Sequence, residues 1–149
     1  MPAFGNRSQE KLDSCHEDIQ KVLNEAIKFF DFSVLEGIRS NMRQMSLYQE
    51  GKSQLDGVER RSKHQADDGI SMAVDIMPYY KGFNAFVSEN GPKSFYHLAG
   101  IILGIADRMF AAGEIEHQFR WGGNWDRDSD LFGDSNFFDL PHFELIKPL

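Results

Sequence analysis

Two long stretches of the chain repeat apolar residues at the spacing of an α-helix. The first starts after Ser14, which stands three residues before Glu17 in the spacing of a capping box. Its apolar positions recur every three or four residues and form one stripe: Ile19, Val22, Leu23, Ala26, Ile27 and Phe30. The second stretch covers residues 92–112, begins with a proline and is followed by Gly113, and both residue types suit the ends of a helix. A shorter helix is predicted over residues 41–49.

Four further segments have the pattern of β-strands, at residues 31–38, 70–77, 116–121 and 143–146. The segment 70–77 alternates moderately, contains β-branched residues and is stopped by Pro78. The polar segments 50–61 and 122–136 are predicted to be loops. Helices and strands do not alternate strictly along the chain. This order favours an α+β fold, in which helices pack on a small antiparallel sheet.

The composition limits the class of protein. The chain has 149 residues, which is the usual length of one domain, and a net charge of −7 that lies wholly after residue 64. Because no basic cluster is present, nucleic-acid binding is not expected. The longest apolar run, residues 98–106, is far shorter than the ~20 residues of a membrane span, so no stable membrane association is expected. The N-terminus lacks the apolar core of a secretory signal, and the single Cys15 excludes a disulfide framework.

Two histidines and two aspartates have the residue types of a catalytic zinc site. Such a site needs three protein ligands and an open position, and His64, Asp75 and His142 would supply them. The ion would lower the pKa of water to about 7, and a separate carboxylate would take the proton. Asp139 stands three residues before His142, and a tight turn around Pro141 would aim both at one ion. On spacing alone, surface polar residues in loops remain the simpler interpretation.

Ordered motifs add to these residues. They read GIRS at 37–40, SKH at 62–64, AVDIMPY at 73–79, FRWGGNW at 119–125 and DLPHFEL at 139–145. Together they resemble the zinc peptidases of the D-alanyl-D-alanine carboxypeptidase and L-alanyl-D-glutamate endopeptidase family. The resemblance is greatest to the short phage endolysins of that family, and it covers residues 37–145.

The resemblance implies a role for each matching residue. His64, Asp75 and His142 would bind Zn²⁺. Asp139 would act first as the general base and then as the acid that protonates the leaving amine. Arg39 would hold the scissile carbonyl oxygen or a substrate carboxylate, because its guanidinium suits such contacts. The implied activity is hydrolysis of the L-alanyl-D-glutamate bond in peptidoglycan stem peptides.

One departure from the family pattern lies between two of these ligands. The spacing from His64 to Asp75 is eleven residues, and the segment 65–68 appears as an insertion that would form a loop beside the metal. Asp67 or Asp68 could compete as a ligand, but neither begins a strand-like run. Asp75 is therefore the preferred ligand.

Two other functions remain open. A D-alanyl-D-alanine carboxypeptidase or dipeptidase would use the same ligands, and a non-catalytic phage structural or binding protein could retain the fold. The complete set of ligands and base argues against the second. As an endolysin, the protein would be a monomer without a separate wall-binding domain, made in the host cytoplasm and acting in the periplasm. It would then need a holin-type partner for release.

Other marked residues carry weaker expectations. His16 and His97 are expected at the surface or in packing, and Cys15 in the interior; His117 could approach the cleft. Trp121 and Trp125 suit either a cleft wall or the core. Glu144 shares a strand face with His142 and could orient it. The acidic residues of the second loop suit a solvated or a cation-responsive segment: Asp126, Asp128, Asp130 and Asp134.

Overall fold

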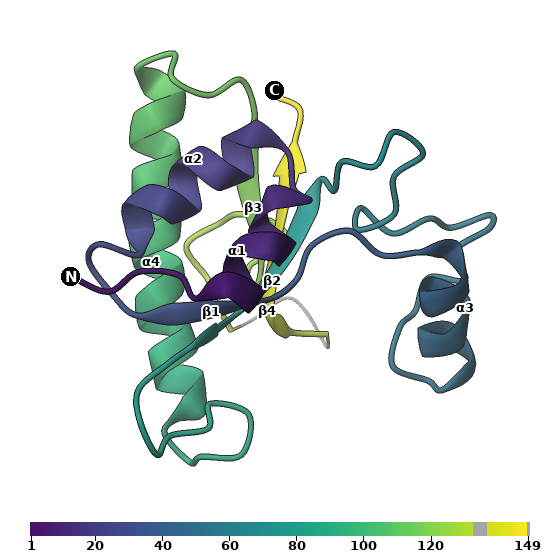
Figure 1. Ribbon diagram of the computed structural model, residues 1–149, viewed down its shortest axis with the longest axis horizontal. Coiled ribbons are helices and arrows are strands. Elements are labelled where there is room, and N and C mark those ends of the chain that lie inside the picture. The colour runs from purple at the N-terminus through teal and green to yellow at the C-terminus, as the bar shows by residue number, and fades with distance from the viewer. Residues whose placement is uncertain (133–136, 149) are drawn as a thin grey trace.

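A computed structural model of the protein describes residues 1–132 and 137–148 (Figure 1). Its centre is a four-stranded antiparallel sheet in the order β1-β2-β4-β3. The strands are β1 (Phe32–Glu36), β2 (Ala73–Pro78), β3 (Gln118–Gly122) and β4 (Asp139–Ile146). The helices are α1 (Asn6–Asp13), α2 (Glu17–Ala26), α3 (Asn41–Gln49) and α4 (Gly91–Ala111). The predicted α+β class with an antiparallel sheet is confirmed.

The two predicted apolar stripes form the core with one face of the sheet. Helices α2 and α4 pack against each other, and α4 also contacts β2, β3 and β4. The positions that face inward are almost fully buried on both helices, among them Ile19, Leu23, Leu98 and Ile102. Burial of this apolar surface is the main stabilising contribution that such elements make. No helix in the described part of the chain is long and apolar enough to cross a membrane.

The start of the chain differs from the prediction. Helix α1 was not expected, and Ser14 ends it instead of capping the next helix. The Ser14 hydroxyl donates to the Lys11 carbonyl at 2.6 Å and accepts from the Ile38 amide at 2.9 Å. His16 caps α2, because its Nδ1 accepts from the Asp18 amide at 3.0 Å. The predicted capping box is therefore wrong, and the helix ends at residue 26 rather than 30.

The last strand also differs from the prediction. Strand β4 begins at Asp139, so Asp139 and His142 lie on one extended strand and the predicted tight turn is wrong. The pairing of β3 with β4 shifts register between Trp121 and Gly122. This shift leaves Leu140, Pro141 and His142 without a partner on β3, which accommodates the proline, since proline has no amide to donate to a ladder.

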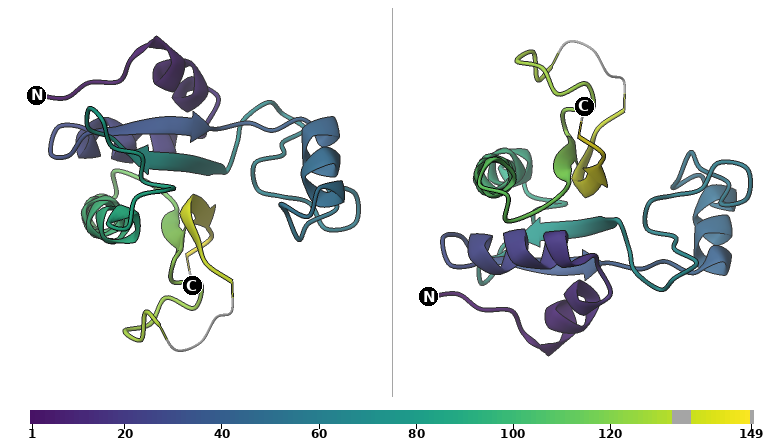
Figure 2. Two further views of the ribbon diagram at one scale, coloured as in Figure 1. Left: turned by 90° about the horizontal axis from the view of Figure 1, so that it is seen from below. Right: turned by 90° about the horizontal axis from the view of Figure 1, so that it is seen from above.

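Helix α3 lies apart from the other helices. Its predicted bounds are confirmed, and Ser40 caps it by accepting from the Arg43 amide at 3.0 Å. Figures 1 and 2 show α3 and the loops that follow it projecting from one side of the sheet, with α4 on the other side. This projection, residues 40–63, provides one wall of the cleft described below.

Candidate active site

The sheet aligns charged residues from three strands. Asp75 on β2 pairs with Glu36 on β1 and with His142 on β4. In the next row, Glu144 on β4 pairs with Arg120 on β3. Directly opposed residues of neighbouring strands have side chains within contact distance. Residues that are far apart in the sequence are thereby collected on one face of the sheet.

Three ligand atoms converge at this face. The distance from His64 Nε2 to His142 Nδ1 is 3.2 Å. Asp75 Oδ1 lies 3.3 Å from His64 Nε2 and 3.2 Å from His142 Nδ1. Ligands at the 2.0–2.1 Å typical of zinc in a tetrahedral site are about 3.3–3.4 Å apart. The triangle of donor atoms therefore has the dimensions of three corners around one such ion.

The remaining nitrogen of each imidazole ring is held by an acceptor. His64 Nδ1 lies 2.8 Å from the Gly37 carbonyl, and His142 Nε2 lies 2.9 Å from Glu144 Oε1. Both acceptors favour a proton on the far nitrogen, which leaves the converging nitrogens with free lone pairs. Two lone pairs and a carboxylate at these distances can together coordinate a cation. The donor set therefore fits a divalent metal ion.

The charges at the site have shifted pKa values. Burial alone would raise the pKa of Asp75, but hydrogen bonds with His142 and His64 hold it well below its usual range. Burial opposes charge on His142, yet hydrogen bonds to Asp75 and Glu144 raise its pKa to about 9. Burial would also raise the pKa of Glu144, but hydrogen bonds from His142 and Arg120 lower it to about 2. Asp75 and Glu144 thus favour positive charge on the His142 ring that lies between them, and Asp75 would equally favour a metal ion next to that ring.

The segment after β1 fixes the position of His64. The Gly37 carbonyl accepts from the His64 ring, and the Arg39 amide donates to the His64 carbonyl at 2.7 Å. Gly37 packs directly against the end of α1: a Cβ there would lie 2.3 Å from Ser14 Oγ and 2.4 Å from the Lys11 carbonyl. Only glycine allows this approach. Ser14, which accepts from the Ile38 amide, therefore helps to hold the segment that contacts His64. The sequence pattern did not indicate this contact.

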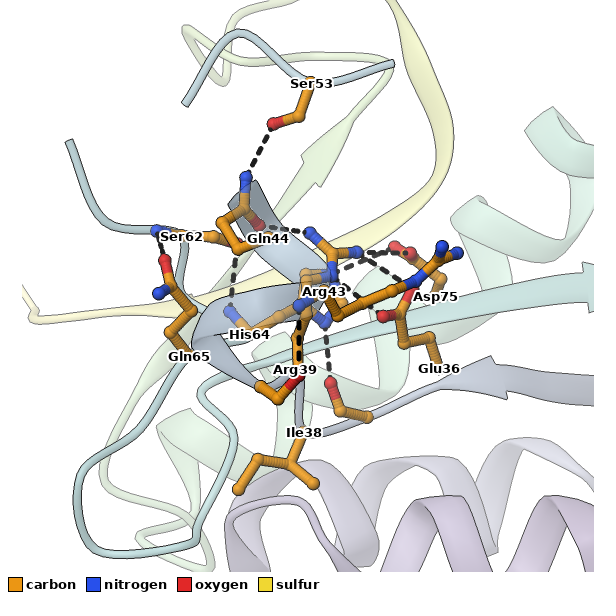
Figure 3. Close-up of polar contacts among 12 residues, drawn as sticks. Glu36, Ile38, Arg39, Arg43, Gln44, Ser53, Ser62, His64, Gln65 and Asp75 are labelled. Atoms are coloured by element: carbon orange, nitrogen blue, oxygen red, sulfur yellow. Dashed lines mark hydrogen bonds and ion pairs between the residues drawn. The ribbon is translucent and has the colours of Figure 1, made fainter. Parts of the chain in front are cut away.

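Arg39 is held rigidly beside His64 and Asp75 (Figure 3). Its Nε and Nη2 donate to the two carboxylate oxygens of Glu36 at 2.8 and 2.9 Å, and its Nη1 donates to Gln44 Oε1 at 2.7 Å. Its Nη2 also lies 3.7 Å from Asp75 Oδ2. The bidentate contact with Glu36 fixes the plane of the guanidinium. The fork is thus oriented before any substrate enters.

Gln44 connects Arg39 to the cleft wall. Its side chain is fully buried, and its amide nitrogen donates to Ser53 Oγ at 2.9 Å and to the Leu55 carbonyl at 2.7 Å. Its two N–H bonds are thus both used, and its oxygen accepts from Arg39, so the orientation of the amide is set. Sequence reasoning missed Gln44 and Glu36, because both are ordinary polar residues until the fold brings Arg39 between them.

Asp139 lies close enough to Asp75, His142 and His64 for their charges to act on its carboxyl. Gly122 contacts it so closely that a Cβ on the glycine would lie 2.1 Å from the Asp139 carbonyl. Burial, together with the nearby Asp75 charge, raises the pKa of the Asp139 carboxyl. A carboxyl with a raised pKa is a better proton acceptor and donor near neutral pH. The position suits the predicted acid–base role.

A cavity of about 540 Å³ opens over these residues. It is lined by His64, Asp75, His142 and Arg39, by residues of the projection 40–63 that include Lys52, Leu55 and Lys63, and by Arg120, Trp125 and Phe137. A volume of this size suits a short peptide segment.

The inserted segment, residues 65–68, turns away from the three converging residues His64, Asp75 and His142. Gln65 is buried, and its side chain bonds to the Ser62 amide at 2.9 Å and to Asn41 Oδ1 at 2.8 Å. Asp67 and Asp68 are exposed, and Asp67 forms an ion pair with Arg61. Asp75, rather than either of these aspartates, lies with the two histidines.

His117 does not approach the cleft. It belongs to a separate group with His16 and the buried Asp18. Asp18 Oδ2 accepts from the amides of Glu116 and His117 at 3.0 and 3.1 Å, and lies 2.9 Å from His117 Nδ1. These contacts fasten the segment before β3 to the start of α2, which is a structural role.

The remaining marked residues have separate positions. Cys15 is buried, and burial raises the pKa of its thiol to about 12, so it is inert as a nucleophile. Trp121 belongs to the core, whereas Trp125 lines the cavity. The exposed ring of His97 contacts Phe30.

The acidic loop has exposed carboxylates at Asp126, Asp128 and Asp130. Asp128 Oδ1 accepts from the Asp130 amide at 2.8 Å, and Asp130 Oδ1 accepts from the Phe132 amide at 3.2 Å. These two acids therefore stabilise turns of the loop itself. Asp134 lies outside the described residues.

Replacing Glu144 by glutamine is expected to weaken metal binding by about 10–100-fold. The change removes the carboxylate charge that orients and polarises the His142 ring while it keeps the shape of the side chain. Titration against a chromophoric chelator measures the affinity. The exposed Glu89, changed in the same way, is the control. An unchanged affinity in the Glu144→Gln variant would show that the carboxylate does not tune the ligand.

Comparisons with known proteins identify the family of the chain. No curated protein matches the chain. The crystal structure of the L-Ala D-Glu endopeptidase ChiX from Serratia marcescens is similar, with 27% sequence identity and a TM-score of 0.68. The match covers 97% of this chain and 90% of that chain. The family described as phage L-alanyl-D-glutamate peptidase matches residues 2–146, and the chain therefore belongs to this family.

Proposed function

We propose that the protein is a zinc-dependent endopeptidase that cleaves the L-alanyl-D-glutamate bond of peptidoglycan stem peptides. The observation that carries the proposal is the triangle of His64, Asp75 and His142 donor atoms, in which each imidazole is oriented by an acceptor on its other nitrogen. Family membership and the similarity to an L-Ala D-Glu endopeptidase support the choice of bond. Two histidines and one carboxylate suit zinc among the common metals.

The protein's own residues supply the proton transfers and the orientation of the substrate. His64, Asp75 and His142 would hold the zinc ion, which would supply Lewis acidity for acidifying water and polarising a carbonyl. Asp139 takes the proton from the attacking water and later donates it to the leaving nitrogen. Arg39, fixed by Glu36 and Gln44, directs its remaining N–H groups toward the scissile carbonyl oxygen. The rigid site requires little reorganisation during the reaction.

We further propose that the enzyme lyses a bacterial host as a monomeric phage endolysin. A phage protein is made in the host cytoplasm, whereas the wall lies outside the inner membrane. A separate holin-type partner would therefore give the enzyme access to its substrate. The family assignment supports this role, because the family is one of phage peptidases.

Digestion of purified muropeptides tests the activity. The expected products carry a new N-terminus at D-glutamate, and mass spectrometry identifies them. Removal of the metal with a chelator should stop the reaction, and addition of zinc should restore it. Release of terminal D-alanine would instead support a carboxypeptidase. Binding without any cleavage would support a non-catalytic protein.

A further inference from the structure

The cavity has the opposite charge to the whole chain. Among residues 1–132 and 137–148, five cationic side chains line it: Arg39, Lys52, Arg61, Lys63 and Arg120. The same part of the chain contributes four carboxylates: Glu36, Asp75, Asp139 and Glu144. The chain as a whole has a net charge of −7. A divalent ion would make the cavity still more positive, so the cavity suits an anionic ligand.

Arg120 is a cavity cation with most of its hydrogen-bonding capacity unused. Arg61 is also singly bonded, to the exposed Asp67, but Arg120 bonds to Glu144, the carboxylate that holds His142. Arg120 Nη2 donates to Glu144 Oε2 at 2.7 Å, and its other four N–H groups have no partner among residues 1–132 and 137–148. The Nε among them is buried, and leaving it unpaired is unfavourable. The guanidinium carbon lies 5.5 Å from the centre of the Trp125 ring, which fixes the plane of the group. The side chain is 35% exposed, so a ligand can reach it.

The surroundings of Arg120 are also positively charged. Lys63 Nζ lies 3.6 Å from the same Glu144 oxygen that Arg120 contacts. The other oxygen of Glu144 bonds to His142. Two cations therefore share one carboxylate that is already engaged by a histidine. The positive charge of Arg120 and Lys63 therefore lies near His142, with only the Glu144 side chain between them.

Arg39 is less suited to binding an anion. Three of its five N–H groups are bound to Glu36 and Gln44, and its side chain is only 10% exposed. Its Nη2 also faces Asp75, which would repel a second carboxylate at that position. The contacts of Arg39 suit an uncharged carbonyl oxygen better.

We propose that Arg120, with Lys63 beside it, binds the free carboxylate of the glutamate residue that follows the scissile bond. The inference rests on the proposed function and specifies the substrate. Glutamate has two carboxyl groups, and a peptide continues from only one of them. The other is ionised at neutral pH and lies within a few bonds of the scissile nitrogen. Arginine recognises such a group through paired charged hydrogen bonds.

Two synthetic stem peptides test the proposal. One carries D-glutamate after L-alanine, and the other carries the same residue with its free carboxylate converted to a carboxamide. The wild-type enzyme should cleave the first with a kcat/KM at least about tenfold higher. The Arg120→Gln variant should lose this preference, because its rate on the carboxylate peptide falls more than its rate on the amide peptide. The Arg120→Lys variant should restore part of the preference.

The ratio of the two rates separates recognition from a structural role. If Arg120 only supported Glu144 and His142, its loss would slow cleavage of both peptides equally and would reduce the metal content of the protein. Lys52→Gln is the matched control, since it removes another cavity cation, one that forms an ion pair with Glu50, and it should keep the preference. An unchanged ratio in Arg120→Gln, or equal rates in the wild type, overturns the inference alone. A wild-type enzyme that cuts neither peptide overturns the proposed function as well.

Discussion

Replacement of Asp139 by asparagine is expected to lower kcat by about 10²–10⁴-fold while the metal content stays near that of the wild type. The side chain lines the cavity but is not one of the three converging donors. Asparagine keeps its size and cannot accept a proton at neutral pH. The loss should therefore fall on proton transfer rather than on metal binding or folding. Muropeptide digestion measures kcat, and elemental analysis measures the metal.

The same substitution at Asp107 provides the control, since that residue is exposed on α4 and away from the cavity. Thermal unfolding of both variants shows whether either is destabilised. Full activity in Asp139→Asn would remove Asp139 from the mechanism. A folded variant that has lost its metal as well would instead make Asp139 part of the metal-binding group.

Much of the fold follows from local patterns in the sequence. The stripes of α2 and α4 have enough apolar positions at helical spacing to specify both helices and their buried faces. Helix α1 could not be found in this way, because Leu12 is its only buried residue. A stripe requires several buried positions, and this short helix is stabilised through Ser14 and the segment after β1 instead.

The errors in the prediction arise where a distant partner decides the local structure. Ser14 and Glu17 have the spacing of a capping box, but the Ser14 hydroxyl bonds to Ile38, 24 residues away. Pro141 suggested a turn, but pairing of its neighbours with β2 and β3 keeps the chain extended. In both cases tertiary hydrogen bonds outweigh the local preference.

The candidate site shows the same division. The motifs identified His64, Asp75, His142, Asp139 and Arg39, and the structure places all five at one cavity. Their roles remain predictions. The residues that orient them were harder to find, because Gln44 is a polar residue of a helix and its burial depends on Ser53 and Leu55. Such residues gain their importance only from partners that the fold supplies.

The charge of the chain also gains meaning from the structure. Acidic residues dominate the second half of the sequence, which argued against recognition by general attraction to an anionic surface. The cavity nevertheless collects cations from both halves, including Arg39 and Lys63 from the first and Arg120 from the second. Recognition of an anionic peptide can therefore be local while the exterior stays acidic.

Replacement of His142 by alanine is expected to weaken metal binding by more than the about 10–100-fold expected for Glu144→Gln, and to abolish muropeptide cleavage. The change removes one of the three donors that converge in the described part of the chain and leaves Asp75 and His64 unable to enclose an ion. Wild-type protein should gain thermal stability when zinc is added, by about 2.7 kcal/mol at a free zinc concentration 100 times the Kd. The variant should not gain it under the same conditions.

Two other histidines make this result specific. His97→Ala changes an exposed residue of α4 and should keep both metal binding and activity. His117→Ala tests the second group of possible ligands, formed with His16 and Asp18, and should also keep the catalytic metal. If zinc binding survives in His142→Ala but is lost in His117→Ala, the ion belongs to the second group and the proposed metal centre is wrong. If only His142→Ala loses zinc, metal binding and cleavage both depend on His142, the ring that Glu144 orients on β4.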